Sequence, residues 1–321
     1  MIFVLLTALI IWCVFLSHSP AIGSFLYRLN NAVELKLAGL RIQHMSHVGK
    51  NNSETFSYLE SKKQRVTGQN ESNDNTIIML HGFSADKLIW LKFAKYFTHQ
   101  NVLIPDFMAH GDIAYDKSTK YSAYEQAKYI ARFICAKQVT GNITLIGNSM
   151  GGMVAAILAE KAHQDQDYDI GDATIADVVL LDPAGAKTEF ATTMHAQGYN
   201  PFVHESPRDV YSFYDMAMHR PPFMPPSVKA FIAQTNYIAK REQYAHMFAD
   251  FFNPSEFFSE PLANIQANVR VIWGEQDALL PVSDADSWSS IVGIKANIMR
   301  DTGHMPMVER PKQTVSLINY P

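Results

Sequence analysis

A serine lies between two glycines in Gly147-Asn148-Ser149-Met150-Gly151, which fits the pattern G-x-S-x-G. The strand-like run ITLI precedes the motif and a helix-like segment follows it, so the serine falls at a strand-to-helix turn. Such a turn is strained and pushes the hydroxyl away from the backbone, and only small flanking residues let strand and helix approach each other. We therefore expect Ser149 to be a nucleophile.

A serine hydroxyl barely ionises near neutral pH, so a nucleophilic serine needs a base and a third group that orients that base. Where the serine occupies a strand-to-helix turn of this kind, the acid and then the histidine follow it, each after a later strand. Asp277 follows the strand-like run VRVIW, and His304 follows NIMRDTG. The order of the chain thus predicts Asp277 as the acid and His304 as the base.

Three other residues compete for these roles. Asp182 also follows a strand-like run, but Pro183 comes directly after it, and the expected order favours Asp277. His81 and His110 both precede Ser149, and the glycine that follows each of them indicates a role in shaping a loop. Asp182 stays open as the alternative acid.

Acyl transfer also needs donors that face the developing oxyanion, and backbone amides at the start of a helix are oriented for this. The amide of Met150 is one candidate. The loop after TIIMLHG offers the second, which makes the Phe83 amide the expected partner. Because the backbone supplies the donor, the Phe83 side chain is free to line a pocket.

Short apolar runs alternate with amphipathic segments from about residue 56 onward, which predicts a mostly parallel sheet covered by helices. The fold class is therefore α/β. Residues 68–75 have the composition of an exposed turn. We expect strands within 76–83, 101–112, 143–146, 178–185, 269–277 and 296–305, and helices over 88–97, over 121–137 and from 150 onward.

The segment 186–262 interrupts this alternation, because it has helical periodicity and no comparable strand. It is rich in phenylalanine, tyrosine and methionine and contains two proline pairs. We expect an inserted helical subdomain in which most rings pack against one another. Together they would form an apolar wall above a site, since methionine and aromatic surfaces suit flexible hydrocarbon ligands.

The chain begins with an apolar run over residues 2–16, which as a helix is ~22 Å long at 1.5 Å per residue. A hydrocarbon core of ~30 Å needs about 20 residues. The run therefore fits a signal-peptide core, with Ala21-Ile22-Gly23 as a small-residue cleavage site, although no Lys or Arg precedes it. A helix that continued to Leu26 would be long enough for a membrane anchor. We expect an anchored protein, or an exported one if residues 1–26 are cleaved, with a buried N-terminal helix as the alternative.

Composition excludes several classes of function. The 321 residues are 47% hydrophobic, which suffices for one large core with an inserted subdomain. The net charge is −4 and the chain has no Lys/Arg run, so no basic surface for binding nucleic acid is expected. Cys13 and Cys135 provide neither a disulfide framework nor a thiolate metal site. No carboxylate or cysteine accompanies His44 and His47 as a further metal ligand. We therefore expect these two histidines to be surface residues that bind no metal.

From about residue 56 to residue 320, the chain resembles the α/β-hydrolase superfamily. The resemblance rests on five motifs in order: HGFSADKLIW, GNSMGG, LDPAG, WGEQDALLP and GHMPMVERP. Within this superfamily, the chain resembles the membrane-associated monoacylglycerol lipases and related bacterial lipases that carry a short N-terminal apolar segment. The resemblance implies an eight-stranded doubly wound sheet over 27–185 and 263–321, a helical cap over 186–262 after the sixth strand, and no cofactor. It also implies ester hydrolysis through Ser149, Asp277 and His304, with Phe83 and Met150 as oxyanion donors.

The expected function is hydrolysis of lipid carboxylic esters through an acyl-serine intermediate. Two alternatives stay open. Hydrolases that cleave carbon–carbon bonds in ring-fission products have an elbow similar to GNSMGG, although their HGxGPG-like loop differs from HGFSAD here. A non-catalytic receptor for hydrophobic ligands can also be built on this fold.

Overall fold

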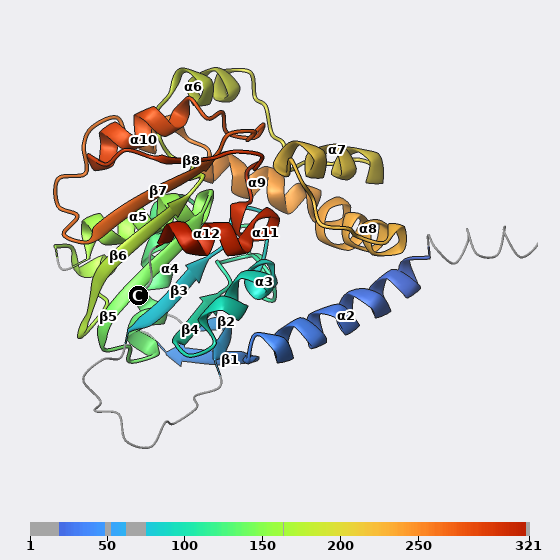
Figure 1. The fold of residues 1–321 in the computed structure, drawn as a ribbon, viewed down its shortest axis with the longest axis horizontal. Helices are drawn as coiled ribbons and strands as arrows, with labels where there is room; N and C mark the ends of the chain where they lie inside the picture. The colour runs from blue at the N-terminus through green and yellow to red at the C-terminus, as the bar shows by residue number, and fades with distance from the viewer. Residues whose placement is uncertain (1–18, 49–52, 62–74, 163, 319–321) are drawn as a thin grey trace, which may run out of the picture.

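An eight-stranded sheet forms the centre of the computed structural model, which describes residues 19–48, 53–61, 75–162 and 164–318 (Figure 1). The strand order is β1-β2-β4-β3-β5-β6-β7-β8. β2 pairs antiparallel with β1 and β4, and the other neighbours are parallel, which confirms the expected α/β sheet. The strands are β1 Leu40–Val48, β2 Ser53–Ser61, β3 Thr76–Leu80, β4 Asn101–Pro105, β5 Gly141–Asn148, β6 Ala173–Leu181, β7 Asn268–Gly274 and β8 Asn297–Met299.

Helices cover both faces of the sheet (Figure 1). One face carries α4 (Ala123–Ala136), α5 (Met150–Lys161) and α10 (Asp284–Val292), and the other carries α3 (Leu91–Ala94), α11 (Pro306–Glu309) and α12 (Pro311–Ile318). Both faces of the central strands are covered, so β3 is buried along its whole length and four of its five residues are apolar. This two-sided cover holds the carboxyl ends of the parallel strands in fixed positions.

Two helices next to the centre of the sheet follow directly from their sequences. α4 begins where the Ser122 side chain accepts a hydrogen bond from the Glu125 amide, and its buried residues recur at helical spacing. α5 begins at Met150, as predicted, and every residue from 150 to 158 is buried. α5 is therefore a core helix, apolar on all sides.

The apolar segment 88–97 differs from the expected single helix. It consists of a 3₁₀ turn at Lys87–Trp90, the short α3, and a second 3₁₀ turn at Lys95–Phe97. Trp90, Phe93 and Phe97 are buried with successive ring centroids 5.6 and 5.2 Å apart. The packing of these three rings, rather than helical periodicity, sets the local backbone.

The segment between β6 and β7 is helical, and its helices group beside the carboxyl ends of the strands (Figure 1). Within its described residues the only β pairing is a single bridge between Ala186 and Phe258. Its elements are α6 Glu189–Ala196, α7 Pro207–Ala217, α8 Pro226–Ile232, a π-helical segment Ala233–Tyr237, a 3₁₀ turn Ile238–Lys240, α9 Arg241–Phe251 and a 3₁₀ turn Pro254–Glu256.

The first described helix, α2 (Pro20–Leu37), runs past residue 26 and lies against α8 (Figure 1). A Cβ atom at Gly23 would overlap the Ser227 carbonyl oxygen, so glycine is needed for this close approach. The Tyr27 and Phe231 rings meet at 5.7 Å. The predicted apolar leader over residues 2–16 lies outside the described residues. In the described part of the chain, no helix combines the length and apolar character required to span a bilayer.

Candidate active site

Ser149 occupies the sharp turn between β5 and α5. Its backbone has φ +56° and ψ −119°, an unfavourable conformation for a residue with a side chain. The Ser149 amide donates to the Leu181 carbonyl oxygen at 3.0 Å, which fixes the turn against β6. The strained turn that the sequence predicted is therefore present, and the Ser149 side chain is only 8% exposed.

The flanking glycines let the backbone of the turn approach its neighbours. A Cβ at Gly147 would overlap the Gly151 carbonyl oxygen, and a Cβ at Gly151 would overlap that of Leu80 at the end of β3. A Cβ at Gly152 would lie 2.8 Å from the Pro183 Cβ. The small residues around Ser149 are thus required by contacts with the backbone of α5, β3 and the loop after β6.

His304 and Asp277 form a buried pair at the carboxyl ends of β8 and β7. The His304 Nδ1 and Asp277 Oδ2 atoms are 2.7 Å apart. The Asp277 Oδ1 atom accepts from the amides of Leu279 and Leu280 at 2.8 and 2.9 Å, so the carboxylate is held by three donors. With its Nδ1–H donated to Asp277, the neutral imidazole keeps Nε2 as an acceptor. That nitrogen is buried and finds no partner among the described residues.

Backbone and side-chain hydrogen bonds tie the His304 loop to the serine turn and to the inserted helices. The Asn148 amide group donates to the His304 carbonyl oxygen at 2.9 Å and to that of Leu181 at 3.1 Å. The His304 amide donates to the Ala217 carbonyl oxygen at the end of α7 at 3.0 Å. Four elements far apart in the sequence therefore meet around one histidine.

The loop after β3 lies directly against Ser149, since a Cβ at Gly82 would be 3.3 Å from the Ser149 Cβ. Phe83 is the next residue of this loop and lines the same cavities as Ser149. Met150 is the first residue of α5, so its amide has no acceptor within the helix. Both predicted oxyanion donors thus belong to segments that adjoin Ser149.

Two cavities reach Ser149. The larger, of 570 Å³, is also lined by His304, and its volume is typical of small-molecule sites. The smaller, of 40 Å³, has a lining that is almost entirely apolar. The Phe83 ring stands between them and contacts the rings of Phe202, Tyr244, Phe248 and Phe251 at centroid distances of 4.7 to 5.8 Å. The aromatic wall expected from segment 186–262 therefore faces the serine.

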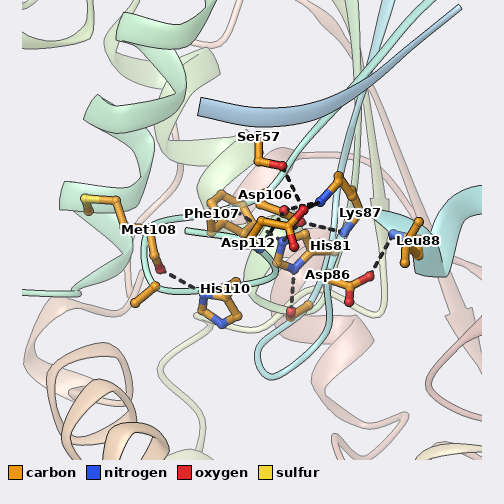
Figure 2. Close-up of polar contacts among 12 residues, drawn as sticks. Ser57, His81, Asp86, Lys87, Leu88, Asp106, Phe107, Met108, His110 and Asp112 are labelled. Carbon is orange, nitrogen blue, oxygen red and sulfur yellow. Dashed lines mark hydrogen bonds and ion pairs between the residues drawn. The ribbon is translucent and has the colours of Figure 1, made fainter. Parts of the chain in front are cut away.

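A buried ion pair joins Lys87, four residues after Phe83, to Asp106, and the partly exposed Asp112 extends it. Figure 2 shows Lys87 bonded to both Asp106 and Asp112; the Nζ–Oδ2 distances are 2.6 and 2.7 Å. The Lys87 amide also donates to Asp106 Oδ1 at 2.8 Å, and Ser57 donates to Asp112 at 3.1 Å. Removing one partner of a buried pair leaves an uncompensated charge and is strongly destabilising. The network therefore fixes the loop that carries Phe83 to the loop after β4.

His81 and His110 lie in the same region and are buried (Figure 2). The His81 ring donates through Nδ1 to the Gly82 carbonyl oxygen at 2.8 Å and accepts from the Phe107 amide at 3.2 Å. The His110 ring donates through Nδ1 to the Met108 carbonyl oxygen at 2.9 Å. Burial lowers the pKa of His81 to about 4 and the pKa of His110 to about 3. Both rings are therefore neutral parts of the loop structure, in line with the role that the sequence suggested.

The neutrality of His110 predicts a pH-dependent effect of His110→Asn, in which the asparagine amide can keep the bond to the Met108 carbonyl oxygen. Between about pH 3 and the ordinary histidine pKa of ~6.5, the unfolded wild type binds a proton that the folded wild type does not. The wild type loses this contribution to stability as the pH falls, and the variant does not. We expect the stability advantage of the wild type to shrink by about 2 kcal/mol from pH 7 to pH 5 in urea unfolding. An advantage that is independent of pH would contradict a neutral buried His110.

The ion pair was not predicted from the sequence. Lys87 begins an apolar segment, and nothing in its neighbourhood indicates that its ammonium group turns inward to Asp106. The position of Asp106 at a strand end was the available signal. His44 and His47 are exposed on β1, as expected.

The chain matches the model of the alpha/beta hydrolase family over residues 77–317. It belongs to the alpha/beta hydrolase family. The expectation of a hydrolase on this fold is thereby confirmed, together with the resemblance to lipases and monoacylglycerol lipases.

Several relatives of this hydrolase have names that describe an activity. Lipase 1 of Psychrobacter immobilis is 28% identical over 253 residues, which cover 76% of this chain and 75% of that protein. Monoacylglycerol lipase ABHD6 of Homo sapiens is 26% identical over 295 residues, which cover 87% and 81%. A solved structure described as a membrane phospholipase A and bacterial virulence factor superposes with a TM-score of 0.75 at 28% identity, covering 98% of this chain and 94% of that one.

Proposed function

We propose that this hydrolase cleaves carboxylic esters of lipids through an acyl-enzyme on Ser149, with Asp277 and His304 completing the triad. The observation that carries the proposal is the 2.7 Å contact between His304 Nδ1 and Asp277 Oδ2. It leaves His304 Nε2 without a partner among the described residues, in the same cavity that Ser149 lines. An oriented imidazole with a free acceptor nitrogen is what a serine nucleophile requires.

In the first half of the reaction, His304 Nε2 accepts the Ser149 hydroxyl proton while Oγ attacks the carbonyl carbon. Asp277 stabilises the imidazolium that forms, and it stays ionised. The amides of Phe83 and Met150 donate to the oxyanion; one such donor contributes ~2.7–4 kcal/mol of barrier lowering. His304 then gives its proton to the leaving alcohol as the carbon–oxygen bond of the ester breaks.

In the second half, water attacks the acyl-serine carbonyl carbon while His304 accepts its proton. The proton returns to Ser149 Oγ as the acyl–oxygen bond breaks, and the fatty acid leaves. No cofactor takes part in either half.

The two cavities support a lipid ester as the substrate. Their shared border includes Ser149, Phe83, Phe202 and Leu279, so the two halves of an ester can lie on opposite sides of the reacting carbonyl. The larger cavity has the volume for a long hydrocarbon chain, and the apolar rings of segment 186–262 line both cavities. We infer that this segment acts as a cap over the hydrolase core. The names of the relatives, lipases and monoacylglycerol lipases, point to the same substrate class.

Exposed apolar side chains next to the larger cavity favour a lipid surface as the source of substrate. Phe25 and Leu29 on α2 are 65% and 50% exposed, and Phe223 before α8 is 91% exposed. Leu29 and Phe223 both line the cavity. Exposed apolar patches mark interaction sites more often than scattered residues do. We propose that this end of the molecule faces a membrane, whether the apolar N-terminal segment remains as an anchor or is removed on export.

The test is hydrolysis by the full-length protein of an ester series from acetyl to oleoyl, including monooleoylglycerol in lipid vesicles. We expect kcat/KM to peak at medium or long chains, because a longer chain buries more apolar surface in the cavity. A maximum at acetyl esters in solution would contradict the lipid assignment. A folded protein without any ester hydrolysis would favour the carbon–carbon hydrolase or the receptor alternative.

A further inference from the structure

Asp182 is a second buried carboxyl group beside the proposed triad acid, and the mechanism above does not use it. It follows β6, has no exposed surface and adopts a φ of +43°, an unfavourable conformation for a residue with a side chain. Its Oδ1 atom accepts from the Gly274 amide at 2.7 Å. Its amide donates to the Ile272 carbonyl oxygen at 2.9 Å. Asp182 is therefore held firmly between the ends of β6 and β7.

The neighbours of the other Asp182 carboxyl oxygen, Oδ2, include acidic groups. Oδ2 is buried and finds no donor among the described residues. The acidic side chain next to Asp182 is Asp277; one oxygen of each carboxyl group and one nitrogen of His304 lie within 4.8 Å of one another. Glu309, on α11, is the next negative group. The Glu309 carboxylate accepts hydrogen bonds from the amides of Gly303 and Arg220. It therefore acts as an acceptor and offers no hydrogen-bond donor to Asp182.

Two carboxyl groups this close cannot both be ionised in a buried site unless a cation compensates them. In the neutral resting state of His304, the described residues around the pair supply no such cation. Burial and the charge of Asp277 raise the pKa of Asp182 well above its usual range. The proximity of the two buried carboxyl groups thus favours a proton on one of them.

The hydrogen-bond partners decide which residue carries that proton. Asp277 accepts from two backbone amides and from His304, an arrangement that stabilises a carboxylate. Asp182 accepts from one amide only, at Oδ1, and its Oδ2 atom is the oxygen that lacks a donor. A proton on Asp182 Oδ2 lets that oxygen donate to the Asp277 carboxylate, which supplies the partner that Oδ2 lacks.

We propose that Asp182 is a neutral carboxylic acid that donates a hydrogen bond to Asp277 and so positions the triad acid. The proposal rests on the proposed function for the role of Asp277. It explains why the chain keeps an acidic residue at a strained, fully buried position without placing a second negative charge beside His304. Asp182 acts through Asp277 and does not contact the reacting atoms.

The proton itself can be detected without any assay of activity. The infrared difference spectrum between wild type and Asp182→Asn at pH 8 should contain a carboxylic-acid C=O stretching band in the wild type. At this pH the other carboxyl groups contribute equally to both spectra and cancel. A difference spectrum that shows a carboxylate band in place of the acid band would overturn the proposal, even if the protein hydrolysed no ester.

The kinetic test compares two substitutions. Asp182→Ala removes the donor to Asp277, and we expect kcat/KM to fall by on the order of tenfold to a hundredfold, as displacement of a catalytic group does. Asp182→Asn is neutral, can accept from the Gly274 amide and can donate to Asp277, so it should rescue most of this loss. The acid limb of the pH profile of kcat/KM should keep its midpoint in Asp182→Asn. A midpoint about one pH unit or more lower would mean that an ionised Asp182 had been removed from beside His304, and would refute the proposal.

Discussion

Ser149→Ala should lower kcat for ester hydrolysis by on the order of a million-fold, because no other atom can form the acyl-enzyme. Alanine fits the turn at least as well as serine, since it is smaller and the neighbouring glycines are unchanged. The oxyanion donors and the cavity remain, so a residual rate above the uncatalysed reaction should persist. The measurement is kcat on the preferred ester of the series, with circular dichroism and thermal unfolding to establish that the variant is folded. A loss of less than a hundredfold would remove Ser149 from the nucleophile role.

Asp277→Asn should lower kcat by about 10⁴-fold at neutral pH. Asparagine can still accept from the amides of Leu279 and Leu280, so the loop after β7 should stay in place. Its amide group would, however, donate to His304 Nδ1 and favour the tautomer with the proton on Nε2. That tautomer cannot accept the Ser149 proton, and the carboxylate that stabilises the imidazolium is lost.

The matched control is Asp177→Asn, in the middle of β6, where the carboxylate forms an ion pair with Arg270 at 3.0 Å. Both of these side chains are partly exposed, and a pair of this kind contributes about 1 kcal/mol or less to stability. We expect the control to keep the wild-type rate. Equal losses in the two variants, or a loss below tenfold in Asp277→Asn, would argue against Asp277 as the acid.

The fold, and the strand ends that carry Ser149, Asp277 and His304, could be predicted because they depend on local patterns in a fixed order. Apolar runs bounded by loops gave the central strands, and G-x-S-x-G between a strand and a helix gave the turn at Ser149. The choice of Asp277 over Asp182 followed from chain order. In the structure, the hydrogen bond to His304 Nδ1 is made by Asp277. The two carboxyl groups nevertheless lie side by side, a proximity that the sequence does not encode locally.

Features that depend on contacts between distant segments could not be predicted. β1 carries polar side chains on both of its faces, so its alternation was too weak to indicate a strand. The inward turn of Lys87 depends on Asp106, which is 19 residues away in the chain. The packing of α2 on α8 depends on one glycine that meets the Ser227 carbonyl. In each case the partner, rather than the residue itself, determines the structure.

The most direct test of the central claim is mass spectrometry of the full-length protein after reaction with a fluorophosphonate, which forms a stable adduct on an activated serine. We expect one adduct per chain, on the peptide that contains Ser149, and none after the substitution Ser149→Ala. A folded protein that forms no adduct, or that forms it on another serine, would contradict the claim that Ser149 is an activated nucleophile.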